Sequence, residues 1–88
     1  MLWEQALQLA QQGEQEEGLY REMLGRARER PELRAFCLSQ ATGNRSRCEA
    51  VLKYWPRQVL IAEQETVRFK LQGLGDPAIL ERLDELIR

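Results

Sequence analysis

The stretch PELRAFCLSQATGNRSRCEAVLKYW, residues 31–55, decides the fold that the sequence predicts. Pro31 suits the first position of a helix, because its φ is already helical and its missing N–H would have no partner there. The segment 41–45 carries the Gly and Asn typical of a loop. Beyond it, apolar residues recur at the i, i+3, i+4, i+7 spacing of one helix face: Cys48, Val51, Leu52 and Trp55. The stretch therefore predicts a helical hairpin bent at Asn44.

The two ends of the second hairpin helix also have sequence signals. Ser46 and Glu49 have the spacing of a capping box, in which a hydroxyl and a carboxylate satisfy free N–H groups at a helix start. Pro56 removes a helix hydrogen bond and clashes with the preceding turn. We therefore expect this helix to start at Ser46 and to end or kink at Pro56.

The residues before the hairpin also have helical spacing. Apolar residues recur over 2–10 and again over 19–27, and the second series should stop near Arg30, because a proline disfavours helical geometry in the residue before it. The polar segment 13–18 between them contains two glycines. It either ends a first helix or forms an exposed part of one long helix.

After the hairpin, the segment 57–72 is ambiguous, because one face is apolar at helical spacing while residues 67–71 alternate like a strand. We expect a helix, since a lone strand in a helical chain has no partner to pair with. Asp76 and Pro77 then have the pattern of an N-cap followed by the first helical residue, and they predict a terminal helix.

Length and composition limit the remaining possibilities. A chain of 88 residues fits one domain, 1–88, and its 43% hydrophobic content is that of a folded protein. The sequence thus predicts an all-α fold: an irregular bundle of four to five short helices with a central helical hairpin. The net charge of −1 gives no general attraction to nucleic acid or anionic membrane. We expect no transmembrane segment, because no stretch is long and apolar enough.

The chain has no histidine, so it lacks the commonest general base and the commonest metal ligand. Two cysteines are too few for a structural zinc site, which takes four Cys or His ligands. We therefore expect no catalytic site, no metal site and no cofactor.

Cys37 and Cys48 lie almost symmetrically about the loop 41–45. Residues equidistant from the turn of an antiparallel helical hairpin face each other, so the spacing predicts a disulfide. It would close a loop of about a dozen residues and contribute roughly 3 kcal/mol. It would also imply an oxidising compartment such as the periplasm, with a leader removed before Trp3. The alternative is two reduced cysteines buried as small hydrophobes in a cytosolic protein.

The centre of the sequence is basic and its flanks are acidic. We interpret this basic centre as a solvated face that pairs with the acidic flanks, within the fold or across a homodimer. A nucleic-acid surface is the alternative, but no helix-turn-helix signature accompanies it, so no nucleic-acid partner is expected. The basic centre consists of Arg26, Arg28, Arg30, Arg34, Arg45, Arg47, Lys53 and Arg57.

Large aromatic residues are expected to lie in the core, namely Trp3, Trp55 and Phe69. Trp3 is alternatively a partner anchor, because large aromatics dominate interface energetics. The candidate partner-binding residues are Trp3, Tyr20, Arg26, Arg30, Arg34 and Trp55.

Residues 20–50 resemble the small entry-exclusion lipoproteins of conjugative plasmids. The resemblance rests on RERPELRAFC (28–37), the Asn/Gly loop and RCEA (47–50), which place two cysteines across a similar interval. The given sequence departs from this family because it shows neither a lipobox cysteine nor a leader and because an additional C-terminal helix is expected. More loosely, it looks like the pilotins of bacterial secretion systems. Either resemblance implies a periplasmic protein that binds a secretion or conjugation component.

These features favour a non-catalytic, protein-binding helical module in a bacterial envelope, secretion or conjugation assembly. The alternative is a cytosolic helical adaptor, small chaperone or inhibitor with free thiols. A nucleic-acid-binding regulator is the third possibility.

Overall fold

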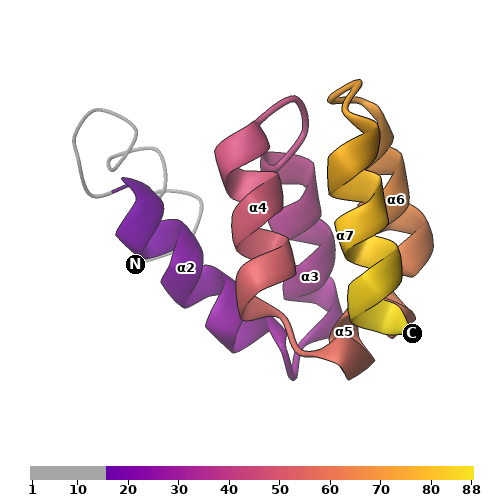
Figure 1. The fold of residues 1–88 in the computed structure, drawn as a ribbon. Coiled ribbons are helices and arrows are strands. Elements are labelled where there is room, and N and C mark those ends of the chain that lie inside the picture. The colour runs from indigo at the N-terminus through magenta and orange to yellow at the C-terminus, as the bar shows by residue number, and fades with distance from the viewer. Residues whose placement is uncertain (1–15) are drawn as a thin grey trace.

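The computed structural model of the chain describes residues 16–88, where all regular structure is helical (Figure 1). This confirms the predicted all-α bundle. The helix expected over 2–10, and Trp3 within it, lie outside the described residues. The helices of the described part are α2 (Glu16–Ala27), α3 (Pro31–Gln40), α4 (Arg45–Tyr54), α5 (Arg57–Ala62), α6 (Gln64–Gln72) and α7 (Pro77–Ile87).

The described part holds six helices, more than expected, because the segment 57–72 is divided in two. Its helical nature is confirmed, but Glu63 between α5 and α6 has φ −108° and ψ 16°, outside the helical range. A single expected helix therefore becomes a short helix followed by a longer one.

The helices α3 and α4 are antiparallel and occupy the centre of the molecule, joined by the turn 41–44 (Figure 1). The helix α2 packs against both of them on one side, and α6 and α7 pack against them on the other. The short α5 lies at one end and carries the chain from α4 to α6. This places α2 beside α4, although 17 residues separate the end of one from the start of the other.

The turn between α3 and α4 differs from the predicted capping box. Gly43 has φ +68°, a left-handed conformation in which residues with a Cβ are disfavoured. The Asn44 side chain then accepts a hydrogen bond from the Arg47 N–H at 3.0 Å. Asn44 is thus the N-cap, and α4 begins at Arg45 rather than after Ser46. The Arg47 N–H lies in the first turn of α4, where N–H groups have no carbonyl partner within the helix, and the amide oxygen of Asn44 satisfies it.

The helix expected to stop near Arg30 ends at Ala27 instead, whereas three other predicted helix boundaries are confirmed. The helix α3 begins at Pro31. The helix α4 ends at Tyr54, because Trp55 before the proline is extended, with ψ 134°. Asp76 caps α7 by accepting a hydrogen bond from the Ala78 N–H at 3.0 Å.

The core draws side chains from every helix of the described part, so these helices share one hydrophobic interior. Phe69, expected in this core, is instead 69% exposed. The neighbouring faces of α6 supply Val67 and Leu71 to the core, which leaves the face with Phe69 toward solvent. Among the described helices, none is both long and apolar enough to span a bilayer.

Candidate functional site

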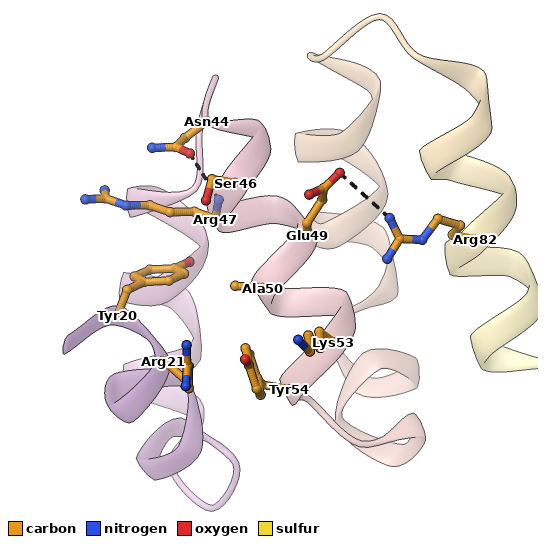
Figure 2. A pocket seen from close by; sticks show the side chains of 10 residues that line it. All are labelled: Tyr20, Arg21, Asn44, Ser46, Arg47, Glu49, Ala50, Lys53, Tyr54 and Arg82. Carbon is orange, nitrogen blue, oxygen red and sulfur yellow. Dashed lines mark hydrogen bonds and ion pairs between the residues drawn. The ribbon is translucent and has the colours of Figure 1, made fainter. Parts of the chain in front are cut away.

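A pocket of about 500 Å³ opens between α2 and α4 and extends to α7 (Figure 2). We call it the α2–α4 pocket. It is lined by Tyr20, Arg21, Asn44, Ser46, Arg47, Glu49, Ala50, Lys53, Tyr54 and Arg82.

The lining of this pocket is basic. Four of its ten residues are cations and one, Glu49, is an anion, although the whole chain carries a net charge of −1. The pocket therefore concentrates positive charge that the composition of the chain does not reveal, and it favours the approach of anionic groups. The cations are Arg21, Arg47, Lys53 and Arg82.

The ring of Tyr54 lies between two of these cations. The Arg21 guanidinium is 5.1 Å from the ring centroid and the Lys53 ammonium is 5.4 Å from it. Figure 2 shows the ring nearly edge-on, with Arg21 on one side and Lys53 on the other. Both distances are within the range of cation–π attraction, so the ring orients the two cations that α2 and α4 supply.

A second aromatic and cationic pair closes the pocket near the start of α4. The Arg47 guanidinium lies 5.2 Å from the Tyr20 ring centroid and donates a hydrogen bond to the Gln40 carbonyl oxygen at 2.8 Å. Arg47 is only 8% exposed, and burial lowers the pKa of its guanidinium. The Tyr20 hydroxyl donates to the Cys37 carbonyl oxygen at 2.6 Å. This pair is a fixed wall of the pocket.

Glu49 lies between two arginines at the rim. Its carboxylate is 3.8 Å from the Arg82 guanidinium on α7 (Figure 2). It is also 3.8 Å from the Arg45 guanidinium on its own helix. All three side chains are about half exposed. Long, exposed ion pairs of this kind contribute little to stability, so these side chains can rearrange at low cost.

The structure distributes the candidate partner-binding residues over different environments. Tyr20 lines the pocket but is 2% exposed. Trp55 is 3% exposed and its indole N–H donates to the Leu24 carbonyl oxygen at 3.0 Å, which makes it a core residue. The Arg34 side chain donates hydrogen bonds to the carbonyl oxygens of Ala27, at 2.9 Å, and of Arg28. Arg34 therefore holds the end of α2.

Arg26 and Arg30 are exposed and line a separate depression at the corner between α2 and α3. Arg26 forms an ion pair with Glu22 at 3.5 Å. These two arginines are therefore not part of the α2–α4 pocket.

The predicted disulfide is not formed in the structure: Cys37 and Cys48 are buried free thiols. The Cys48 thiol donates to the Ala41 carbonyl oxygen at 3.3 Å. Ala41 lies four residues beyond Cys37, about one helical turn of 5.4 Å. The hairpin thus places Cys48 at the level of Ala41, one turn out of register with Cys37. Symmetry about the loop in sequence did not determine the register of the helices.

Sequence reasoning missed most of this site. Arg47 and Lys53 belong to the basic centre that was interpreted as a solvated face. Arg21 and Arg82 lie outside that run, and no sequence pattern connects them across 60 intervening residues. Tyr54, Lys53 and Arg47 all lie on α4. An aromatic residue among cations on one helix was therefore the one sequence signal that could have indicated this pocket.

Within residues 16–88, no group of three or more acidic or cysteine side chains is arranged to hold a metal ion. Comparison of the chain with protein-family models, with curated proteins and with solved structures finds no match.

Proposed function

We propose that this chain is a non-catalytic helical module that binds another protein through the α2–α4 pocket. The observation that carries the proposal is the composition of that pocket: exposed arginine and lysine side chains around a tyrosine ring, on helices fixed by a shared core. Arginine and tyrosine are enriched among the residues that dominate protein–protein interfaces.

A non-catalytic role agrees with the chemistry of the available nucleophiles. Burial raises the pKa of the Cys37 thiol to about 12, and burial also raises that of Cys48. Both thiols are therefore protonated at neutral pH, and a thiol in that form is a poor nucleophile. The sequence contains no histidine to activate a hydroxyl or a thiol.

We propose a cytosolic adaptor, small chaperone or inhibitor with free thiols, in preference to an accessory component of a bacterial envelope, secretion or conjugation assembly. The periplasmic location was inferred from a disulfide between Cys37 and Cys48, and both of these thiols are free. Buried free thiols are typical of proteins in a reducing compartment.

Site-specific photo-crosslinking tests this proposal. The photoreactive residue p-benzoylphenylalanine is placed at Lys53 in the α2–α4 pocket and, in a matched variant, at Phe69. The latter is the most exposed large apolar side chain of the described residues and lies on α6, away from the pocket. We expect a protein adduct of defined mass from position 53 and none from position 69. The adduct is identified by mass spectrometry.

The identified protein is then purified and titrated against the wild-type chain and the Arg21→Ala and Lys53→Ala variants. Weaker binding by both variants, with unchanged circular dichroism, supports the proposal. Crosslinking from position 69 alone, or equal affinity of all three chains for the captured protein, would contradict it.

A further inference from the structure

We infer that the α2–α4 pocket takes an acidic segment of the protein partner, whose carboxylates contact Arg21, Lys53 and Arg82. This inference rests on the proposed protein-binding function and specifies the chemistry of the partner.

Arg21 and Lys53 lack carboxylate partners in the part of the chain that the structure describes. The contact recorded for each of them is with the Tyr54 ring, at 5.1 Å and 5.4 Å. Glu49 lies one turn before Lys53 on α4, but its carboxylate is directed to Arg45 and Arg82 instead. Among the side chains that the structure describes, no acid therefore neutralises either of these two cations at the exposed surface.

The Tyr54 ring also restricts where these two charges can be. A long lysine or arginine side chain loses conformational entropy when it forms an ion pair, and this loss limits the value of exposed pairs. Contact with the ring removes part of that freedom before a ligand arrives. Cations that are already ordered bind carboxylates with a smaller entropic loss.

The third cation, Arg82, can exchange its ion pair with Glu49 for an ion pair with a carboxylate of the partner protein. Its distance of 3.8 Å from Glu49 is long for an ion pair, and both side chains are about half exposed. A carboxylate from a partner can approach Arg82 more closely and form the bidentate contact that guanidinium groups favour. Glu49 would then keep its ion pair with Arg45 on the same helix.

The same geometry disfavours a single-stranded nucleic acid as the occupant. Such ligands bind by stacking bases on exposed aromatic rings along a basic groove. The two sides of the Tyr54 ring are occupied by Arg21 and Lys53 (Figure 2), and the Tyr20 ring is buried. An acidic polypeptide needs no free ring face.

Peptide titrations with the full chain test the inference. The probe is a fluorescently labelled amphipathic peptide of leucine and glutamate, and its controls have glutamine or lysine in place of every glutamate. We expect the glutamate peptide to bind at least about tenfold more tightly than either control. Its affinity should fall when sodium chloride rises from about 50 to about 300 mM, because salt screens exposed charges.

The matched variants are R21E/K53E in the pocket and R28E/R30E at the corner between α2 and α3, which change the net charge equally. R21Q/K53Q repeats the test without introducing repulsion, and circular dichroism checks that each variant is folded. We expect both pocket variants to lose at least about tenfold in affinity and the corner variant to lose less than about twofold. An equal loss in R28E/R30E overturns the inference.

The outcomes separate this inference from the proposed function. If the glutamine peptide binds as tightly as the glutamate peptide, or the glutamate peptide does not bind, the acidic partner is ruled out while the crosslink from position 53 still supports a protein-binding pocket. Tighter binding of a DNA oligonucleotide than of the glutamate peptide overturns the inference in favour of a polyanion site. If position 53 gives no crosslink to a protein, the proposed protein-binding function is overturned as well.

Discussion

Helices α2 to α4 are joined by buried hydrogen bonds from side chains to backbone, whereas α6 and α7 are joined by apolar packing and a surface ion pair. On the first side, the Tyr20 hydroxyl donates to the Cys37 carbonyl oxygen at 2.6 Å. The Trp55 indole N–H donates to the Leu24 carbonyl oxygen at 3.0 Å. Both bonds are buried, and together they connect α2 to α3 and to the end of α4.

On the other side, Ile79 and Leu83 of α7 pack into the core with Val67 and Leu71 of α6. The polar link between these two helices is the ion pair of Arg68 and Asp84 at 2.7 Å, which is about 40% exposed.

This difference between the two sides of the molecule explains how the α2–α4 pocket keeps its shape. Apolar packing is not directional, so it permits small rotations of one helix against another. Buried hydrogen bonds have strict geometry and are expensive to leave unmade, so they fix the separation of α2 and α4. The two walls of the α2–α4 pocket therefore belong to the more rigidly specified side of the molecule. Four measurements test this comparison.

The largest effect is expected from Trp55→Ala. It creates a cavity in the core and leaves the Leu24 carbonyl oxygen without its donor, so the free energy of unfolding should fall by about 3–5 kcal/mol. Phe69→Ala removes a large aromatic that is 69% exposed and should cost less than about 0.5 kcal/mol. Urea unfolding followed by circular dichroism measures both. Equal losses would show that Trp55 does not anchor α4 to α2.

Tyr20→Phe isolates a single hydrogen bond. It keeps the ring against Arg47 but leaves the buried Cys37 carbonyl oxygen unpaired, and the loss should be about 1–3 kcal/mol. Tyr54→Phe is the matched control, because the Tyr54 hydroxyl is not recorded in a hydrogen bond among the described residues. It should change stability by less than about 0.5 kcal/mol. A similar loss of stability in the control would show that the hydrogen bond from Tyr20 to the Cys37 carbonyl oxygen is not what holds α2 against α3.

Alkaline pH should weaken the α2–α4 side. Burial raises the pKa of Cys37 from 9.0 to about 12 and raises that of Tyr20 above its ordinary value of 10.0. Between pH 9 and pH 12 the unfolded thiol loses its proton while the folded thiol keeps it, so stability falls as pH rises.

Urea unfolding at several pH values in this window measures the alkaline loss. Cys37→Ala removes the thiol and should reduce the slope of stability against pH above pH 9, whatever its effect at neutral pH. An unchanged slope in this variant would show that Cys37 does not contribute to it.

The smallest effect is expected from Arg68→Gln on the other side. An exposed ion pair contributes less than about 1 kcal/mol, and about 1 M salt should abolish the difference from the wild-type chain. In a double-mutant cycle, R68Q/D84N should cost no more than either single change. A salt-insensitive loss larger than that of Tyr20→Phe would reverse the comparison of the two sides.

Much of the local structure was predictable because its causes lie within a few residues. Pro31 at the start of α3 and Asp76 with Pro77 at the start of α7 act through adjacent backbone groups. The extended Trp55 follows from Pro56 by steric contact alone. Ser46 was the exception, because Asn44 two residues earlier was an equally good cap and the turn at Gly43 placed Asn44 in position.

The site was only partly predictable. Tyr20 was named as a candidate residue, and the basic centre contained Arg47 and Lys53. Nothing in the sequence connected Arg21 to Tyr54, because their contact depends on the angle at which α2 crosses α4. Phe69 was misplaced for a related reason: both faces of α6 carry apolar residues, and the packing of α6 against α3, α4 and α7 decides which face is covered.

The order of the helices, the ends set by proline and aspartate, the absence of histidine and the burial of the stripe from Cys48 to Trp55 were determined by the sequence alone, because periodicity, proline geometry and side-chain chemistry act locally. The register of α3 against α4 and the gathering of four cations from three helices were decided only by the tertiary structure. Helices of the same amphipathic pattern can pack with their residues shifted by one turn at little cost in buried area. In this structure the Cys48 thiol donates a hydrogen bond to the Ala41 carbonyl oxygen, one turn beyond Cys37.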